Sequence, residues 1–543
     1  MAPPVHPIDA PGGYESSSEG QSADTCDRTG TMNPRLRRIL LVLCLLIAAG
    51  IRCSLFLESR SGPDYAHPLH DAEFRDYWAR AIVTGDWTPP PGREQPFADW
   101  LPYPHAPGYS WLLSGIYRIF GLGYDAPRLI QMFLGLISIL LLYDIARRLY
   151  NDKAGIAAAA LMSLYFVFPF YEMDLGQTSL IVFLLLLLTL FGSKAVKKQH
   201  LLFLTINALL FGILLLVRNE FLPFGIIFLG VHLFSYLKSK NWKKILAGTT
   251  LWCLFSIIPV TPVSVYNYQH AQVLPIVGGE GTYVFYCSNN QWATGTNPDS
   301  PDLRALEKND EWTFFSFPAI QEACARAQNI TPLSYRELQK HFKQLNRKYI
   351  ATEKKRLFWL MLKKAALFWG PVEVDENKVV ACEKDYFAVL RYLPGFPPAM
   401  ALFLLGAVLL FIRAIRKEKN CTKENLAAWT LLLLAMAGYS GIFVLFYVTA
   451  RYRVPVIPFM LLFGAVAVSD WFEWLRRKAF KKAAVGLTAF LLLTALLSRP
   501  LVPFTPDTER WLDERRRLWV KTDRIDEGIA DQGLRGGALL VDL

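Results

Sequence analysis

Long uninterrupted apolar stretches constrain this chain more than any other feature of its sequence. A helix rises about 1.5 Å per residue, so roughly 17 to 25 apolar residues cross the hydrocarbon core of a bilayer, which is about 30 Å thick. Eleven segments fit that length, at residues 38–57, 127–146, 154–171, 175–193, 201–217, 221–237, 245–264, 396–414, 427–448, 454–473 and 483–498. The sequence therefore predicts an all-α polytopic membrane protein with about eleven transmembrane helices.

The composition supports this prediction and removes one class of function. The 543 residues are 53% hydrophobic and 19% charged, with a mean hydropathy of +0.24, which is more apolar than a soluble globular protein. The formal net charge of +12 comes from basic residues that flank the apolar segments. No basic patch is interleaved with aromatic residues as in a nucleic-acid-binding domain, so nucleic acid is not expected as a partner.

The basic flanks also predict the orientation, because Lys and Arg stay on the cytoplasmic side during insertion. Arg35, Arg37 and Arg38 precede the first span and place the N-terminus inside. Alternation then puts all the other basic connections inside as well, so we expect a multi-pass membrane protein with a cytoplasmic N-terminus. The resulting division is a disordered cytoplasmic segment 1–34, a catalytic transmembrane core 35–264 with a first outer loop 58–126, a partly helical extracytoplasmic loop 265–395, C-terminal transmembrane helices 396–498 and an extracytoplasmic tail 499–543.

The first outer loop holds the candidate for chemistry. Residues 71–81 read DAEFRDYWARA, an amphipathic pattern typical of a helix lying on the membrane surface. Asp71 stands at its start, where a carboxylate meets the positive end of the helix dipole. Taken alone, this pattern is better explained by a helix N-cap with a solvated charged face.

The order of further short motifs favours the chemical interpretation. Downstream of Asp71 come Tyr103-Pro104-His105, Pro127-Arg128, Arg147-Arg148, Val217-Arg218, Tyr266-Asn267, Gly278-Gly279-Glu280, Asn289-Asn290, Lys363-Lys364, Phe368-Trp369-Gly370 and Arg451-Tyr452-Arg453. Over roughly residues 38–480, this order resembles the bacterial members of the dolichyl-phosphate-mannose:protein mannosyltransferase and aminoarabinose transferase superfamily. These are integral-membrane glycosyltransferases of the GT-C fold, related to glycosyltransferase family 39, whose active site is formed by extracytoplasmic loops. For this chain the resemblance implies a bacterial inner membrane.

The resemblance implies an inverting glycosyltransferase. Such an enzyme moves a hexosyl or pentosyl group from a polyprenyl-phosphate carrier in the membrane to an acceptor hydroxyl on the extracytoplasmic face. The implied partners are the lipid-linked donor, membrane lipids, and an acceptor that is an exported protein, lipid A or a cell-envelope glycan. In that family the acidic residue of the first loop is catalytic, and Asp71 holds its place.

The chemistry of these residues suits that reaction. The attacking hydroxyl must lose a proton as an oxocarbenium-like transition state forms, and Asp71 is the expected general base. The leaving phosphate needs donors already in place, and guanidinium groups match its geometry. Arg218, Arg451 and Arg453 are the expected donor-phosphate ligands, with ordinary headgroup anchoring as the alternative for each.

Three further residues are expected to support the acceptor or a metal ion: Glu73, His105 and Glu172. A solvated turn, for Glu172, and a structural surface histidine, for His105, are the alternatives. No cofactor is required by the sequence, but Asp71 and Glu73 are the expected ligands if Mg²⁺ or Mn²⁺ takes part, since members of the family differ in this respect. Gln177 stands where the family often has an acidic residue, which weakens a metal or acceptor role there.

A transporter or flippase of a lipid-linked or anionic substrate is the rival function. It would also have about a dozen spans, but the chain has no clear internal repeat and no paired broken helices at the membrane midplane. The outer loop contains Cys287, Cys324 and Cys382. One disulfide is possible among these three cysteines, and the sequence does not decide which of the three pairings it would be.

Overall fold

The computed structural model describes residues 32–521 apart from 63, 199, 238–241, 273–277, 297, 299, 306–314, 331–333 and 418–422. All regular structure within these residues is helical, and they contain no strand. The prediction of an all-α fold is therefore confirmed. Segment 1–34 was predicted to be disordered, and its residues 1–31 lie outside the described residues. Helix α1 begins at Pro34.

Eight helical stretches of the described chain are long and apolar enough to cross a membrane, as expected of a multi-pass membrane protein. They are formed by α1 (Pro34–Arg60), α4 (Asp125–Leu149), α7 (Thr178–Lys198), α10 (Trp242–Ile257) continued by η2 (Ile258–Val260) and α11 (Thr261–Ala271), α18 (Ala388–Arg391) with α19 (Phe396–Ile415), α20 (Lys423–Leu445), α21 (Ala450–Arg453) continued by η3 (Val454–Val456) and α22 (Ile457–Arg476), and α23 (Phe480–Leu497).

The remaining three predicted spans form shorter helices. Two of them are α8 (Leu201–Val217) and α9 (Phe224–Leu237), joined by η1 (Asn219–Phe221). The third breaks between α5 (Asp152–Leu164) and α6 (Val167–Glu172). The 13 residues of α5 rise about 20 Å, which is short of the hydrocarbon thickness. Helix is present at all eleven predicted positions, but eleven full spans are not confirmed.

Helix α22 lies at the centre of the bundle. In the apolar part of the stretch Ala450–Arg476, which contains α22, 83% of the residues are buried. In the neighbouring α23 the share is only 6%, so most of α23 faces outward. Helix α19 packs directly along α22. Gly406 of α19 allows the two helices to approach closely, because a Cβ at this position would overlap the carbonyl group of Phe463. This core carries α21, and therefore Arg451 and Arg453, on a rigid support.

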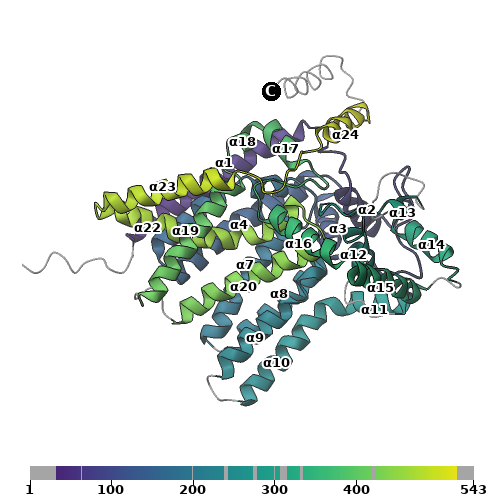
Figure 1. Ribbon diagram of the computed structural model, residues 1–543, viewed down its shortest axis with the longest axis horizontal. Helices are drawn as coiled ribbons and strands as arrows, with labels where there is room; N and C mark the ends of the chain where they lie inside the picture. The colour runs from purple at the N-terminus through teal and green to yellow at the C-terminus, as the bar shows by residue number, and fades with distance from the viewer. Residues whose placement is uncertain are drawn as a thin grey trace, which may run out of the picture.

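A layer of shorter helices gathers toward the upper right of the bundle (Figure 1). It comes from the segments predicted to lie outside the cytoplasm, and the side of the membrane on which it lies stays a prediction. Its helices are α2 (Asp71–Thr84), α3 (Gly108–Phe120), α12 (Gly281–Ser288), α13 (Pro301–Arg304), α14 (Phe317–Ala327), α15 (Tyr335–Thr352), α16 (Lys354–Phe368), α17 (Val380–Tyr386) and α24 (Thr508–Lys521).

This layer has a small apolar core of its own, in which Tyr283, Phe317, Leu338 and Phe342 pack together. The aromatic rings of Tyr283 and Phe342 meet edge to face with their centroids 5.3 Å apart. Cys324 and Cys382 are free thiols, so none of the three disulfide pairings left open by the sequence is formed. Packing, not cross-linking, therefore holds the layer together.

Helix α2 is fixed at both ends. Gly85 ends it in the left-handed conformation, with φ of 77°, and its N–H donates to the carbonyl of Ala81. At the other end, His70 adopts a φ of 55°, which is uncommon for a residue with a side chain, and turns the chain into the helix. The first residue after this turn is Asp71.

Candidate active site

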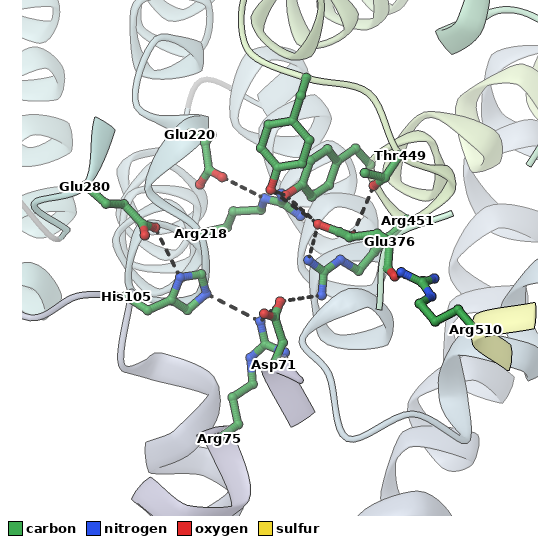
Figure 2. A network of polar contacts seen from close by, with 12 residues as sticks. Asp71, Arg75, His105, Arg218, Glu220, Glu280, Glu376, Thr449, Arg451 and Arg510 are labelled. Atoms are coloured by element: carbon green, nitrogen blue, oxygen red, sulfur yellow. Dashed lines mark hydrogen bonds and ion pairs between the residues drawn. The ribbon is translucent and has the colours of Figure 1, made fainter. Parts of the chain in front are cut away.

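A buried cluster of charged residues lies where the helical layer meets the membrane helices (Figure 2). Its members come from parts of the chain that are far apart in sequence. Asp71 and Arg75 stand on the first turns of α2, Arg218 follows α8, and Arg451 stands on α21. Three of the residues expected from sequence, Asp71, Arg218 and Arg451, therefore share one site, with His105 at its edge.

Asp71 is held by two guanidinium groups. Arg451 Nη1 donates to Asp71 Oδ2 at 2.8 Å, and Arg75 Nη2 donates to the same oxygen at 3.2 Å. Burial alone would raise the pKa of the Asp71 carboxyl, but the charges of Arg451 and Arg75 outweigh it and hold that pKa well below its ordinary value. Asp71 is therefore ionised in this arrangement.

Arg451 is shared between two carboxylates. Its Nη2 donates to Glu376 Oε1 at 3.0 Å, while its Nε is buried without a hydrogen-bond acceptor. Glu376 also accepts from Thr449 at 3.2 Å and from the hydroxyl groups of Tyr452 at 3.1 Å and Tyr447 at 3.3 Å. Glu376 thus fixes the guanidinium plane of Arg451 from the side opposite Asp71.

Arg218 forms the second cationic group of the site. Its side chain is 4% exposed and its Nε donates to Glu220 at 3.3 Å. The guanidinium carbon lies 4.3 Å from the ring centroid of Tyr452 and 5.0 Å from that of Phe443, so the aromatic faces stabilise its charge. Arg218 and Arg451 thus bring two guanidinium groups to the site, and guanidinium groups in general match the geometry of a phosphate.

His105 lies between Arg75 and Glu280. Its Nε2 is 3.4 Å from Arg75 Nη2, and its Nδ1 is 3.4 Å from Glu280 Oε1. Burial and the charge of Arg75 lower the pKa of His105 to about 3, and burial raises the pKa of Glu280 well above its ordinary value. The surroundings therefore favour the neutral form of both groups.

The structure does not bring the other expected residues into the cluster. Glu73 points toward Arg93, with 2.9 Å between Glu73 Oε2 and the guanidinium group. Glu172 is bound by Arg52 of α1 through two contacts of 2.7 Å inside the helical bundle.

Arg453, two residues after Arg451, points elsewhere as well. It pairs with Glu373 at 2.7 Å, donates to the carbonyl of Gly370 at 2.6 Å and stacks on Phe396 with its guanidinium carbon 3.8 Å from the ring centroid. Arg453 therefore holds the chain that leaves α16, rather than facing Asp71.

A metal ion does not fit these residues. Within the part of the chain that the structure describes, no group of three or more His, Cys, Asp or Glu side chains is arranged to hold one. Asp71 contacts two arginines, whose charge repels a cation, and Glu73 is engaged by Arg93. No step is therefore assigned to Mg²⁺ or Mn²⁺.

The sequence assigned no role to Arg75, Glu220, Glu280 and Glu376, which are also members of the cluster. Glu280 stands in the glycine-rich stretch Gly278 to Gly281, and Glu376 follows Phe368-Trp369-Gly370 by a few residues. Both motifs belong to the order noted above. A carboxylate in the first motif, and one shortly after the second, were the sequence features that could have indicated Glu280 and Glu376.

Part of the chain matches a known protein family. Residues 104–266 match the family model of dolichyl-phosphate-mannose-protein mannosyltransferases. The match confirms the resemblance found in the sequence, and it includes His105, Glu172 and Arg218. No curated protein matches the chain.

Solved structures of membrane glycosyltransferases also resemble the chain. The apo oligosaccharyltransferase of Archaeoglobus fulgidus superposes with a TM-score of 0.48 at 13% identity, over 92% of this chain and 60% of that one. The same archaeal enzyme, AglB, in complex with an inhibitory peptide and a dolichol-phosphate gives 0.46 at 14% identity, over 92% and 59%. ArnT from Cupriavidus metallidurans bound to undecaprenyl phosphate gives 0.35 at 14% identity, over 81% and 79%. The chain thus spans about three fifths of the archaeal enzyme's length.

Proposed function

We propose that this protein is an inverting membrane glycosyltransferase that moves a sugar from a polyprenyl-phosphate carrier to an acceptor hydroxyl on the extracytoplasmic face. The observation that carries the proposal is the contact between Asp71 and Arg451. It joins a carboxylate that is 13% exposed to a buried guanidinium group that has an unused donor, beside the membrane helices. This transfer requires a base for the acceptor hydroxyl and a ligand for the leaving phosphate, and the two residues are proposed to supply them.

The donor phosphate is the proposed ligand of Arg218 and Arg451. A sugar phosphodiester becomes a phosphate monoester as it leaves, so negative charge grows during the reaction. Two guanidinium groups that are already buried and oriented need little rearrangement to receive that charge. The aromatic rings around Arg218 keep its side chain in place before the donor arrives.

Asp71 is the proposed general base. While Arg451 and Arg75 hold it, the pKa of Asp71 is low and the carboxylate is a weak base. A bound phosphate engages Arg451 and supplies negative charge nearby, which raises the pKa of Asp71 toward its ordinary value. The base is thereby strengthened when the donor is in place.

The transfer itself is a single displacement. The acceptor oxygen gives its proton to Asp71 and forms a bond to the anomeric carbon, while the bond from that carbon to the phosphate oxygen breaks. The polyprenyl phosphate leaves on the face opposite the attack, which inverts the anomeric configuration. The neutral pair of His105 and Glu280 lies beside Arg75 and is proposed to contact the acceptor.

The test is transfer by the purified protein in lipid nanodiscs. Labelled polyprenyl-phosphate sugars are supplied with three acceptor fractions, namely exported proteins, lipid A and envelope glycans. The proposal expects label on one acceptor fraction, free polyprenyl phosphate in equal amount, and an inverted anomeric configuration by NMR. Movement of the lipid-linked sugar across liposomes with no transfer would contradict it and favour the transporter.

A further inference from the structure

The C-terminal helix α24 reaches both sides of the Asp71–Arg451 ion pair. It begins at Thr508, eleven residues after the end of α23 at Leu497, and lies beside the layer of short helices (Figure 1). One of its contacts is to the residue that precedes Asp71, and another is to the residue whose carboxylate holds Arg451. No role in the site is otherwise evident for this charged segment from its sequence.

The contact on the Asp71 side is a hydrogen bond between two side chains. Glu514 Oε1 lies 3.0 Å from Nε2 of His70. His70 has the positive φ noted above and directly precedes Asp71, so the backbone conformation of His70 sets the position of the Asp71 carboxylate. A conformation uncommon for a side-chain-bearing residue persists where surrounding contacts hold it, and Glu514 supplies one.

The contact on the Arg451 side is a hydrogen bond to the main chain. Arg510 Nη2 donates to the carbonyl oxygen of Glu376 at 2.9 Å, and Figure 2 shows Arg510 approaching Glu376 from outside the cluster. The N–H of Asp507 donates to Asp375 Oδ2 at 2.9 Å, which fixes the same segment. The carboxylate of Glu376 is thus presented to Arg451 by a backbone that α24 holds.

The docking of α24 is strong enough to carry such a role. Trp511, 4% exposed, donates from its indole nitrogen to Glu383 Oε1 at 3.0 Å, and Arg515 pairs with Glu383 Oε2 at 3.2 Å. The guanidinium carbon of Arg515 lies 4.1 Å from the ring centroid of Tyr386. These contacts anchor α24 on α17 independently of Glu514 and Arg510. One anchored helix therefore presents Arg510 and Glu514 to the catalytic cluster, and these two side chains also pair with each other at 3.7 Å.

We infer that α24 is a positioning element of the active site, in which Glu514 and Arg510 hold Asp71 and Arg451 in register with each other. The inference rests on the proposed function, since the register matters only if this pair acts on a substrate. Neither residue touches the reacting atoms. Displacing one of two groups that must act together by a fraction of an ångström lowers turnover strongly, even when binding survives.

The test compares Glu514→Gln and Arg510→Gln with Asp513→Asn, each in the full-length protein in nanodiscs. Asp513 lies on the same helix, is 59% exposed and pairs only with the equally exposed Arg516 among the contacts described, so it controls for loss of charge. Hydrogen exchange is measured at the first amides of α2, where Ala72 and Phe74 donate to Leu69 and His70. Sugar transfer is measured as kcat and KM separately.

We expect Glu514→Gln to speed exchange at Ala72 and Phe74 and to lower kcat about fivefold to twentyfold, with the KM for the donor nearly unchanged. The double variant of His70→Gln and Glu514→Gln should then lose no more than the larger single loss, because both remove one contact. Alkylation of the Cys382 thiol, which touches Thr508 of α24, should keep the wild-type rate and show that the helix stays docked.

Unchanged exchange or unchanged kcat in both α24 variants would overturn the inference, as would an equal loss in Asp513→Asn. If the wild-type protein transfers no sugar, the proposed function fails by that result alone. The exchange measurement then decides the inference: faster exchange in Glu514→Gln supports a positioning contact, and wild-type exchange overturns it.

Discussion

At the scale of single residues, the site depends on how one guanidinium group is shared. Arg451 donates to Asp71 and to Glu376 through different nitrogen atoms, at 2.8 and 3.0 Å. A lysine would keep the charge but has no planar fork with which to hold both carboxylates. The planar group, more than the charge, is therefore what the site needs from this residue.

Arg451→Lys tests this dependence. The loss of charge-assisted hydrogen bonds worth about 1.5–3 kcal/mol predicts a fall of about tenfold to a hundredfold in kcat/KM for the donor. Steady-state transfer over a range of donor concentrations measures it. Arg499→Lys, at an exposed position beyond α23, is the control and should behave as wild type. A wild-type value for Arg451→Lys would show that the bridge has no part in catalysis.

The low pKa of Asp71 predicts a characteristic pH dependence. A cation near a carboxylate lowers its pKa, so removing Arg75 raises the pKa of Asp71 and the acid limb of kcat/KM moves to higher pH. The expected displacement for Arg75→Gln is about one pH unit or more, whereas the wild-type profile should stay level until well below the ordinary range of an aspartate near pH 4. Coincident profiles would exclude Asp71 as the group that titrates.

Residues of the site could be predicted from sequence where they stand beside motifs at helix ends, as Asp71, Arg218 and Arg451 do. Their partners could not be predicted, because they are distant in sequence. Glu376 lies 75 residues from Arg451, and Glu280 lies 175 residues from His105. Arg453 shows a second limit. Side chains two positions apart on a helix point about 200° away from each other. Arg451 and Arg453 therefore face different surroundings although both belong to the same motif.

At the scale of elements, Arg453 acts as a link between α21 and the chain after α16. It donates to the carbonyls of Phe368, Gly370 and Val372 and pairs with Glu373. These groups lose their partner together when the side chain is removed.

Arg453→Ala should therefore lower stability more than turnover. Breaking a buried ion pair from one side costs about 3–5 kcal/mol, which predicts a clear fall in the thermal unfolding midpoint in detergent. Transfer per folded molecule at low temperature should stay within a few-fold of wild type. Full stability with lost activity would instead restore Arg453 as a donor-phosphate ligand.

The packing of α19 against α22 gives a second prediction for elements. Gly406 has no space for a Cβ because the carbonyl of Phe463 lies against it. Gly406→Ala should push the two helices apart and cost about 1–3 kcal/mol, seen as a lower unfolding midpoint.

Gly441 of α20 is the matched control, since nothing lies within 4 Å of a Cβ placed there. Gly441→Ala should leave the midpoint unchanged or raise it slightly, because alanine favours helix. Equal losses in the two variants would mean that the close helix approach is not what Gly406 provides.

At the scale of the whole molecule, apolar length predicted the fold well and its details less well. The apolar runs located a helix at each expected position, since a bilayer admits few other structures. The break at Tyr165 and Phe166 between α5 and α6 could not be seen, because the residues around it are as apolar as those of a continuous span. The contacts of α24 were also beyond prediction, because its charged residues have no pattern until they meet α17 and Glu376.

The orientation predicted from basic residues completes the proposal for the whole molecule. The helical layer, the charged cluster and α24 lie together, and the basic connections 194–198, 413–417 and 476–482 belong to other ends of the membrane helices. If those basic connections are cytoplasmic, a lipid-linked sugar reaches Asp71 from the outer leaflet.

The most direct test of the central claim is sugar transfer by Asp71→Asn in nanodiscs beside wild type and Asp86→Asn. Asp86 lies in the same outer loop, is exposed, and caps a turn at Thr88. The claim predicts that Asp71→Asn folds as wild type but transfers about a hundredfold more slowly or worse, as expected when a general base is lost, while Asp86→Asn keeps its rate. Transfer by Asp71→Asn at the wild-type rate would contradict the claim.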